Sequence, residues 1–237
     1  MSEPETIINW LNSFFLHENE LSGKKVLITA GPTYEQIDPV RFIGNHSSGK
    51  MGVAIAEEMQ SRGADVTLVL GPSGIKVNGG INVINVTSAA EMLDASEQHF
   101  STADITIMSA AVADYTPVKI AEEKIKKIEK DFSVSLTKTT DILKTLGGLK
   151  KSNQVLVGFA LETNNETAYA LQKLQSKNAD MIVLNSLQDA GAGFGHDTNK
   201  ITIFDKTGNV YPFEMKSKKE VAKDIVNTII KKFYAKN

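Results

Sequence analysis

The sequence predicts an α/β domain whose doubly wound, mainly parallel sheet carries helices on both faces, a Rossmann-like arrangement. From residue 25 onward, short apolar runs alternate with segments of helical periodicity. Strands that alternate with helices form parallel sheets through right-handed crossovers. The loops of unusual composition all follow predicted strands, at residues 30–48, 71–74, 109–117, 160–165 and 185–199. Ligands of such sheets bind beyond the carboxyl ends of the strands, so we expect one binding site at that edge.

The predicted strands of this sheet cover residues 26–28, 65–70, 82–86, 105–108, 155–159 and 181–184. A helix begins near residues 47–52 and has an apolar face of Val53, Ile55, Ala56 and Met59. Ser88-x-x-Glu91 and Ser217-x-x-Glu220 are capping boxes that predict helices ending near residues 100 and 233. A further helix is expected over residues 166–178.

Three segments fall outside this alternation. Residues 3–17 predict an amphipathic helix, so we divide the chain into an N-terminal helix and linker, residues 1–22, and a single domain, residues 23–237. Residues 124–138 are basic and then alternating, which favours a two-stranded β-arm without an obvious partner strand nearby. Such an arm is marginal alone, so pairing across a two-fold axis is expected. Residues 200–214 predict a C-terminal hairpin.

Composition restricts the class of protein and its partners. The 237 residues carry 26 Lys+Arg against 28 Asp+Glu, a net charge of −2, which gives no reason to expect nucleic acid or an anionic membrane. The absence of cysteine excludes disulfides and a thiol nucleophile, and the four histidines lack the paired spacing of a zinc site. No apolar run approaches the roughly 20 residues of a membrane span, and residues 1–20 lack a signal peptide's basic start. We therefore expect a cytoplasmic protein.

The small residues at the start of the second predicted element form a candidate anion site. Ser47, Gly49 and Gly52 stand where the first N–H groups of a helix lack internal partners and the helix dipole favours negative charge. Gly44 begins a spacing like that of the P-loop, but Met51 replaces the Mg²⁺-binding Ser or Thr and no predicted strand runs directly into Gly44. The alternative is a glycine turn that only packs the helix on the sheet.

Other loops offer weaker candidates. Residues 109–115 place small side chains where a base or ribose could lie. Within them, Asp114 could hold a ribose hydroxyl or a metal-bridging water. The alternative is that Asp114 is a solvated loop aspartate. The lysines at 124, 126 and 127 either neutralise a polyphosphate or form a solvated face. Lys173 and Lys177 lie on one helix face and could share an anion. The glycine-rich residues 191–195 suggest a lid.

Taken together, several strings resemble the phosphopantothenate–cysteine ligase family of coenzyme A biosynthesis. They occur in family order and cover about residues 24–233. The strings are AGPT (30–33), IDPVRFI (37–43), NHSSGKMG (45–52), AAVADY (110–115), KIKK (124–127), GFA (158–160) with ET (162–163), and GFG (193–195) with DTN (197–199).

The resemblance implies a two-step ligation. The carboxylate of 4′-phosphopantothenate attacks the α-phosphate of CTP, which gives an acyl-cytidylate and pyrophosphate. The amine of L-cysteine then displaces CMP and forms 4′-phosphopantothenoylcysteine. Bacterial members, which this chain resembles, use CTP as co-substrate with Mg²⁺, whereas eukaryotic relatives use ATP. No protein metal ligand is assigned, and Mg²⁺ is expected on the triphosphate.

The resemblance also implies roles for individual residues. The catalytic residues are Asn45, tied to conversion of the acyl-nucleotide, and Lys124, tied to the first step. Substrate-binding residues are Asn45, Arg41 and Asn185. The nucleotide-binding residues are Gly31, Ser47, Gly49, Gly52, Ala110, Asp114, Lys124, Phe159, Lys173 and Lys177.

The family's organisation implies a homodimer in which the arm after Lys124 crosses to the second subunit. It also implies a possible fused or associated phosphopantothenoylcysteine decarboxylase, because residues 3–22 resemble the linker that follows that domain. Two positions depart from the family pattern: Thr140 replaces a common proline, and Leu161 replaces a small residue. The alternatives are a dinucleotide-dependent oxidoreductase and a non-catalytic nucleotide-binding module on the same fold.

Overall fold

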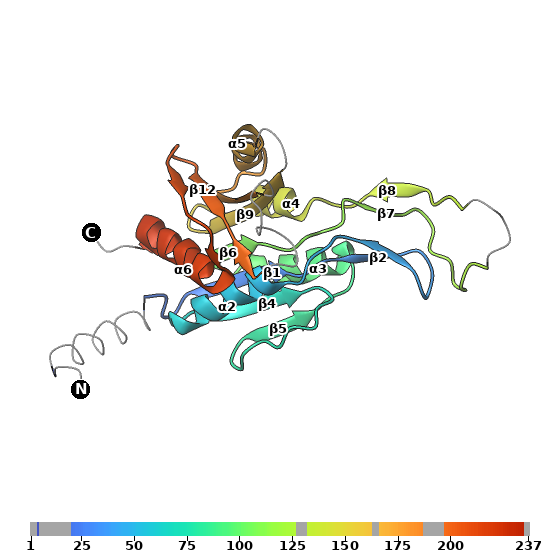
Figure 1. Cartoon of the computed structure of the whole chain (residues 1–237), viewed down its shortest axis with the longest axis horizontal. Coiled ribbons are helices and arrows are strands. Elements are labelled where there is room, and N and C mark those ends of the chain that lie inside the picture. The colour runs from blue at the N-terminus through green and yellow to red at the C-terminus, as the bar shows by residue number, and fades with distance from the viewer. Residues whose placement is uncertain (1–3, 5–19, 127–131, 163–165, 187–196, 235–237) are drawn as a thin grey trace.

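A mixed eight-stranded sheet forms the centre of the computed structural model, which describes residues 4, 20–126, 132–162, 166–186 and 197–234 (Figure 1). Its spatial order is β13-β12-β10-β9-β6-β1-β4-β5. The pairs among β5, β4, β1, β6, β9 and β10 are parallel, and β12 and β13 join in antiparallel fashion. The strands are β1 (Lys25–Ala30), β4 (Asp65–Leu70), β5 (Asn82–Asn85), β6 (Ile105–Met108), β9 (Val155–Glu162), β10 (Met181–Ser186), β12 (Ile201–Asp205) and β13 (Val210–Pro212).

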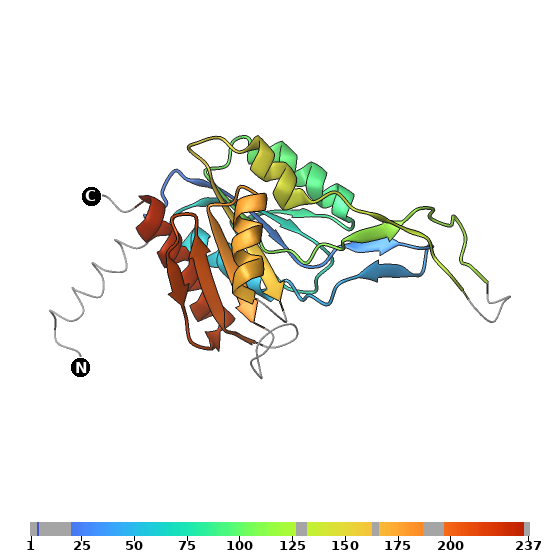
Figure 2. The same cartoon turned by 90° about the horizontal axis from the view of Figure 1, so that it is seen from above.

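Helices cover both faces of the sheet, as Figures 1 and 2 show. One apolar core packs α2 (Lys50–Ser61) and α6 (Lys218–Ile229) against one face. A second core packs α3 (Ala89–Phe100), α4 (Ile142–Leu149) and α5 (Glu166–Ser176) against the other. A π-helical turn, η1 (Ile230–Tyr234), continues α6. The predicted fold class, the β12–β13 hairpin and the last helix are confirmed.

Local sequence signals account for several helix starts. Both predicted capping boxes form, with Ser88 bonded to the Glu91 N–H and Ser217 to the Glu220 N–H. Asp141 caps α4 by accepting from the Lys144 N–H at 2.8 Å. These side chains satisfy backbone donors that a helix start otherwise leaves unpaired. Helix α4 itself was not anticipated from the sequence.

The strand order reverses direction between β1 and β6. The chain proceeds from β1 outward through β4 to β5, and then returns to β6 and builds the other half. The loops after β1 and β6 therefore meet at the centre of the carboxyl edge, where Pro32 and Ala111 form a parallel β-bridge. This is the topological switch point at which doubly wound sheets bind ligands.

A β-arm extends from the body of the domain, to the right in Figure 1. It consists of β7 (Tyr115–Pro117) paired with β8 (Leu136–Lys138), beside a hairpin of β2 (Tyr34–Gln36) and β3 (Phe42–Gly44). The expectation of a β-arm is confirmed, but the expectation that residues 124–138 supply both strands without a nearby partner is wrong. Residues 115–117 supply the partner of the second strand.

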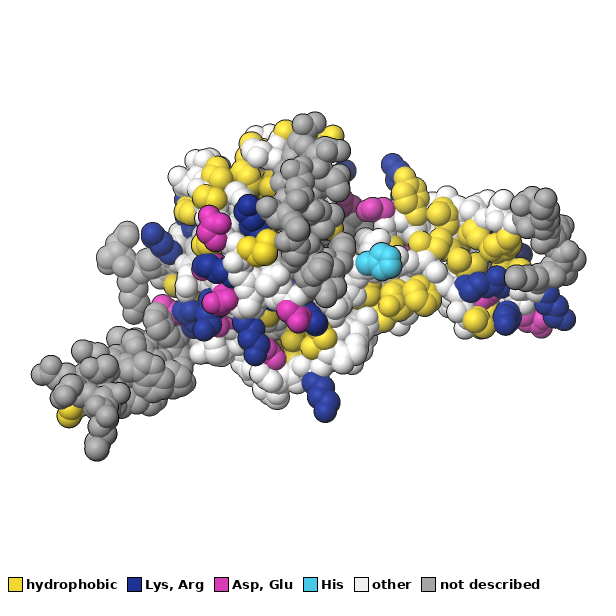
Figure 3. Space-filling model, viewed as in Figure 1, with side chains coloured by type: hydrophobic (Ala, Val, Ile, Leu, Met, Phe, Trp, Pro, Cys, Tyr) yellow, Lys and Arg dark blue, Asp and Glu magenta, His cyan; other side chains and the backbone are white. Residues whose placement is uncertain are grey.

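The β2–β3 hairpin also corrects the reading of residues 30–48 as a plain loop. A strand does run into Gly44, although it belongs to this hairpin and not to the central sheet. Hydrophobic side chains gather on the arm in Figure 3. Among its described residues, the exposed apolar side chains are those of Val40, Phe42, Tyr115, Val118, Ile120, Phe132 and Leu136.

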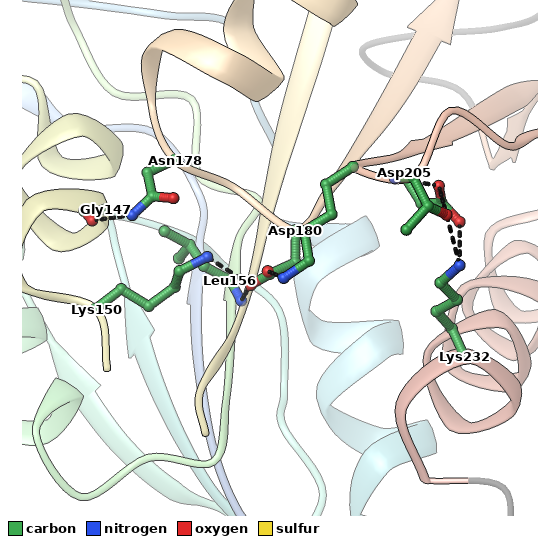
Figure 4. Close-up of polar contacts among 9 residues, drawn as sticks. Gly147, Lys150, Leu156, Asn178, Asp180, Asp205 and Lys232 are labelled. Carbon is green, nitrogen blue, oxygen red and sulfur yellow. Dashed lines mark hydrogen bonds and ion pairs between the residues drawn. The ribbon is translucent and has the colours of Figure 1, made fainter. Parts of the chain in front are cut away.

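Charged side chains on the opposite edge of the sheet are paired within the domain (Figure 4). Asp180 is 1% exposed, accepts from the Leu156 N–H at 2.8 Å and pairs with Lys150 at 2.8 Å. Asp205 pairs with Lys232 at 2.9 Å. Burial raises the pKa of Asp205, but hydrogen bonds from Asn209, Lys232 and Thr207 outweigh it and hold this pKa well below its usual range. These contacts stabilise strand and hairpin ends far from the switch point.

Two sequence predictions lie outside the described residues, namely the helix over residues 3–17 (apart from residue 4) and the lid at 191–195. A small ladder of β11 (Thr198–Asn199) and β14 (Lys216–Ser217) leads into α6. Among the described residues, no helix combines the length and apolar character needed to span a bilayer.

Candidate functional site

The start of α2 lies directly on the switch point. Gly49 is the N-cap residue in a left-handed conformation, φ 79°, and as a glycine it offers no capping side chain. The Lys50 N–H makes only a long contact, 3.5 Å, with Ser48 Oγ. A Cβ at Gly52 would lie 2.5 Å from both Ala30 Cβ and Ser109 Oγ, so this glycine lets the helix approach the ends of β1 and β6. Gly52 therefore has a packing role. The backbone N–H groups of the first turn of α2, next to it, form a site that favours an anion.

Two adjoining cavities form one cleft along this edge. The first, of about 570 Å³, lies over the start of α2, and the second, of about 490 Å³, extends toward the arm. They share a wall of Ala110, Val112, Asp114, Phe159 and Lys173. The combined cleft is thus bounded by the loops after β1 and β6, by β9 and by α5.

Most of the residues predicted from the sequence line the first cavity. They are Asn45, Ser47, Gly49, Gly52, Ala110, Asp114, Phe159, Lys173 and Asn185. Gly31 lies just beneath, because a Cβ at Gly49 would be 3.3 Å from the Gly31 nitrogen. The residues come from six separate stretches of the chain, and the fold brings them together.

Asn45 is fixed by the loop after β6. Its Nδ2 donates to Val112 O at 2.8 Å and, more weakly, to Ala111 O at 3.4 Å. Both contacts use the amide nitrogen, so the amide oxygen points away from these carbonyls. Asn45 can therefore present an acceptor to a ligand in the cleft, and cannot itself remove a proton efficiently.

Lys173 reaches the shared wall of the two cavities from α5. Its Nζ donates to Phe159 O at 2.8 Å, which holds the cation above the end of β9. Asp114 also lines both cavities, and its backbone oxygen accepts from the Thr139 N–H. A cation and a carboxylate that line the same cavities can bind the phosphates and the ribose of one nucleotide.

Lys177 does not line either cavity. Its Nζ pairs with Asp141 Oδ2 at 2.7 Å, and Asp141 lines the second cavity. Burial raises the pKa of Asp141, but the hydrogen bond from Lys177 and that from the Lys144 N–H lower it below its ordinary value. The sequence offered no acidic partner for Lys177 within its own helix, and the structure supplies one from the start of α4.

Arg41 and Lys124 lie on the arm, away from the cleft of their own chain. Arg41 Nη2 pairs with the buried Asp38 at 2.6 Å and also donates to Ile125 O at 2.6 Å. Burial raises the pKa of Asp38, but N–H donors of Val40, Ile125 and Arg41 outweigh it and lower the pKa to about 2. Lys124 is exposed beside this junction.

Two buried polar residues of the first cavity were not assigned a role from the sequence. Asn199 is 2% exposed and Lys218 is 8% exposed, and both line the first cavity. Burial lowers the pKa of Lys218, as does the nearby charge of Lys50, and Asp197 partly offsets this. Neither residue has a local pattern that predicts its burial. Asn199 was noted only as part of the DTN string at 197–199, and Lys218 was not noted at all.

The described residues hold no cluster of three or more His, Cys, Asp or Glu side chains that could ligate a metal ion. Asp114 is the carboxylate lining the first cavity. Mg²⁺ is commonly held by one or two carboxylates together with substrate phosphates. The donor set thus fits Mg²⁺ that arrives on a polyphosphate better than a metal held by the protein alone.

Residues 21–233 match the domain family described as the DNA/pantothenate metabolism flavoprotein C-terminal domain. A relative named cysteine/cysteine sulfinic acid decarboxylase, from an unknown prokaryotic organism, is 53% identical over 97% of this chain. The coenzyme A biosynthesis bifunctional protein CoaBC of Haemophilus influenzae is 48% identical over 98% of the chain.

This chain spans 66% and 58% of the lengths of those two relatives. A crystal structure of the C-terminal domain of a CoaBC protein has a TM-score of 0.77 and 44% identity. The match covers 89% of this chain and 96% of that domain. The chain therefore belongs to the family of the DNA/pantothenate metabolism flavoprotein C-terminal domain.

Proposed function

We propose that this chain is a phosphopantothenate–cysteine ligase that acts in coenzyme A biosynthesis. The observation that carries the proposal is the cleft at the switch point, which gathers nine residues of the implied site in one cavity. The CoaBC relatives support it because their names place them in coenzyme A biosynthesis and they match almost the whole chain.

In the first step, the 4′-phosphopantothenate carboxylate attacks the α-phosphate of CTP. An oxygen–phosphorus bond forms, the bond to the bridging oxygen breaks, and pyrophosphate leaves with the electron pair. The uncapped start of α2 provides N–H donors to phosphate oxygens, and Lys173 adds positive charge at the shared wall. Mg²⁺ bound to the triphosphate supplies further neutralisation of its charge.

In the second step, the cysteine ammonium loses one proton to water, the resulting amine attacks the acyl carbon, and the nitrogen gives up a second proton to water as the amide forms. A carbon–nitrogen bond forms, the carbon–oxygen bond to phosphate breaks, and CMP leaves. Asn45 orients the acyl group, because its amide is fixed by Val112 O and Ala111 O. Asn185, on β10 at the same cavity, contacts the pantothenoyl part of the substrate.

The active unit is proposed to be a homodimer. Arg41 and Lys124 lie on the arm, outside both cavities of their own chain. The arm exposes a row of apolar residues, and such surfaces are typical of interaction sites. A two-fold dimer would cover this surface and would bring the arm of one subunit to the cleft of the other.

The deciding experiment measures pyrophosphate release from CTP or ATP, with and without 4′-phosphopantothenate. We expect release only when the acid is present, with a higher kcat/KM for CTP, because adenine leaves polar groups of a cytosine site unpaired. Pyrophosphate release without 4′-phosphopantothenate would contradict the proposed first step. Equal kcat/KM for CTP and ATP would contradict the proposed nucleotide preference. A non-catalytic module would bind CTP and release nothing.

A parallel assay of carbon dioxide release from cysteine tests the activity in the name of the 53% identical relative. Release of carbon dioxide would show that this chain shares that activity, which the ligase proposal does not predict. A redox change of a nicotinamide cofactor would instead support the oxidoreductase alternative. Because the CoaBC relatives are bifunctional, we also propose a fused or associated phosphopantothenoylcysteine decarboxylase as partner, in the cytoplasm.

A further inference from the structure

Two amide oxygens of the first cavity lack a hydrogen-bond donor. They are Asn185 Oδ1, near the end of β10, and Asn199 Oδ1, on β11. Both atoms are buried, both side chains line the first cavity, and none of the groups that the structure describes donates to either oxygen. Buried acceptors are nearly always paired, because an unpaired one costs the full desolvation penalty of the group. The two oxygens therefore indicate a ligand that brings hydrogen-bond donors to this part of the cavity.

The orientation of the Asn199 amide is fixed by its neighbour on α2. Asn199 is 2% exposed, and its Nδ2 donates to Met51 Sδ at 3.5 Å. Turning the amide over would place the oxygen against the sulfur and lose this contact, because a thioether has no hydrogen to donate. The backbone is held as well, since Asn199 pairs with Lys216 on β14. Asn199 Oδ1 is thus an acceptor that the fold builds into the cavity wall.

The two acceptors come from neighbouring positions of the fold. Asn185 pairs with Ile201 in the antiparallel β10–β12 ladder, and Asn199 precedes Ile201 by two residues. Both asparagines line the first cavity alone, whereas Asp114 and Lys173 line the wall that it shares with the second. The acceptors therefore lie outside the wall to which the phosphates and the ribose of the nucleotide are assigned.

The charge of the first cavity restricts the kind of donor. Of the described residues that line it, three are lysines and one is an aspartate, namely Lys50, Lys173, Lys218 and Asp114. Asp197, which pairs with Lys50, still leaves an excess of positive charge. An excess of positive charge favours an anionic ligand and disfavours a further cation such as an ammonium group. The donors should thus be uncharged groups of a molecule that is negatively charged overall.

Among the substrates of the proposed ligation, 4′-phosphopantothenate has this combination. It is negatively charged at both ends, through its phosphate and its carboxylate. The segment between them carries two uncharged donors, a secondary hydroxyl and an amide N–H. The triphosphate of the nucleotide offers only acceptors, and the amino acid offers its donors on a charged ammonium group.

We propose that Asn199 binds the pantothenoyl segment together with Asn185, a proposal that rests on the ligase function proposed above. The two amide oxygens accept from the secondary hydroxyl and from the amide N–H, one oxygen for each donor. Both oxygens are closed off from solvent, so neighbouring side chains must shift slightly as the acid enters. An acid that lacks either donor leaves a buried acceptor unpaired and binds more weakly. Asn199 therefore contributes to specificity for the acid.

The main measurement is the Kd of three acids by titration calorimetry, with CMP present so that the nucleotide site is filled and no pyrophosphate can leave. The acids are 4′-phosphopantothenate, the analogue without the secondary hydroxyl, and the analogue in which an ester oxygen replaces the amide N–H. The wild-type chain should bind each analogue about 10- to 100-fold more weakly. Asn199→Leu should remove one of these two preferences, and Asn185→Leu should remove the other. Equal Kd values for the three acids in the wild-type chain would overturn the inference without any variant.

Urea unfolding separates binding from a purely structural role. Asn199→Leu removes an unpaired buried acceptor, so its urea midpoint should be no lower than that of the wild-type chain. Asn199→Asp keeps an acceptor in the same place and should keep the wild-type ratios of the Kd values. The control is Asn82→Leu, at an exposed asparagine that begins β5, and it should keep both preferences. Both preferences retained in Asn199→Leu, or a lower midpoint with equal weakening of all three acids, would overturn the inference.

Pyrophosphate release from CTP and 4′-phosphopantothenate tests the ligase function separately. If the wild-type chain distinguishes the three acids but releases no pyrophosphate, the ligase function fails and the assignment of Asn199 to acid binding stands. Release of pyrophosphate combined with equal Kd values for the three acids refutes that assignment alone. The two failures are therefore distinguishable.

Discussion

Asp38 Oδ2 accepts from the Ile125 N–H at 3.1 Å across 87 residues of sequence. The same carboxylate accepts from the backbone N–H groups of Val40 and Arg41, each at 2.9 Å. It thereby ties the β2–β3 hairpin to the segment that carries Lys124. This junction sets the position of the arm on which two implied site residues lie.

The junction leads to a prediction about pH. The pKa of Asp38 is lowered from 3.8 to about 2 in the folded chain. A depressed pKa contributes stability that is fully present above the unfolded value and is lost as the pH falls through the folded value. Asp38→Asn should therefore lower the urea midpoint at neutral pH, and the gap to wild type should shrink between about pH 5 and pH 2.

Limited trypsin digestion supplies the second measurement for Asp38→Asn. Cleavage after Lys124 or Lys126 should be faster in the variant, because the Ile125 N–H loses a charged acceptor. Glu122→Gln, an exposed carboxylate in the same segment, is the control and should be cleaved like wild type. A gap in urea midpoint that does not depend on pH would contradict the role given to the charge.

A second prediction separates the two chemical steps. If Lys124 offsets the charge that builds on the α-phosphate, Lys124→Gln should lower pyrophosphate release by about 10²- to 10³-fold. Asn45→Asp should still release pyrophosphate, while the acyl-cytidylate accumulates and little amide forms. Pyrophosphate and amide are followed separately with all substrates present. Loss of both products to the same extent in Asn45→Asp would show that the assignment to steps is wrong.

The homodimer predicts complementation between these two variants. A mixed dimer of Asn45→Asp and Lys124→Gln chains contains one cleft with a normal Asn45 that receives a normal arm. Random mixing should then restore about a quarter of the wild-type rate in a two-fold dimer. The measurement is amide formation after the two chains are refolded together. Activity no greater than that of the separate variants would place Lys124 in its own chain's site.

The close approach of α2 to the sheet predicts a steric effect. Gly52→Ala places a methyl group 2.5 Å from Ala30 Cβ and Ser109 Oγ, which should cost about 1–3 kcal/mol and weaken triphosphate binding. Gly148→Ala is the control, since its Cβ meets nothing within 4 Å on α4, and it should stabilise the chain by about 0.5–1 kcal/mol. Urea unfolding measures both. Equal stability of the two variants would exclude the packing role of Gly52.

The sequence predicted those parts of the fold that depend on local pattern. The apolar strands, the capping boxes at Ser88 and Ser217 and the carboxyl-edge loops all follow from residues close to one another in the chain. The pairing of Tyr115 with Lys138 does not follow from such local patterns, because residues 118–135 separate the two short strands and contain no turn signal.

The same distinction applies to the site. Ser47, Gly49 and Gly52 stand in one run, so the anion site was predictable from spacing and helix physics. Asn199 and Lys218 became visible only through burial, which arises when β11 pairs with β14 beside the start of α2. An isolated Asn or Lys has no local pattern that distinguishes it from a surface residue.

The bridge between Pro32 and Ala111 has a consequence for how this cleft can change during evolution or redesign. The bridge, together with the bond from the Thr33 N–H to Ala111 O, joins the loops after β1 and β6 into one continuous wall. An insertion in either loop would move the other and shift the support of Asn45. A change in the shape of the cleft at this point would therefore require coordinated changes in both loops, because neither can move alone.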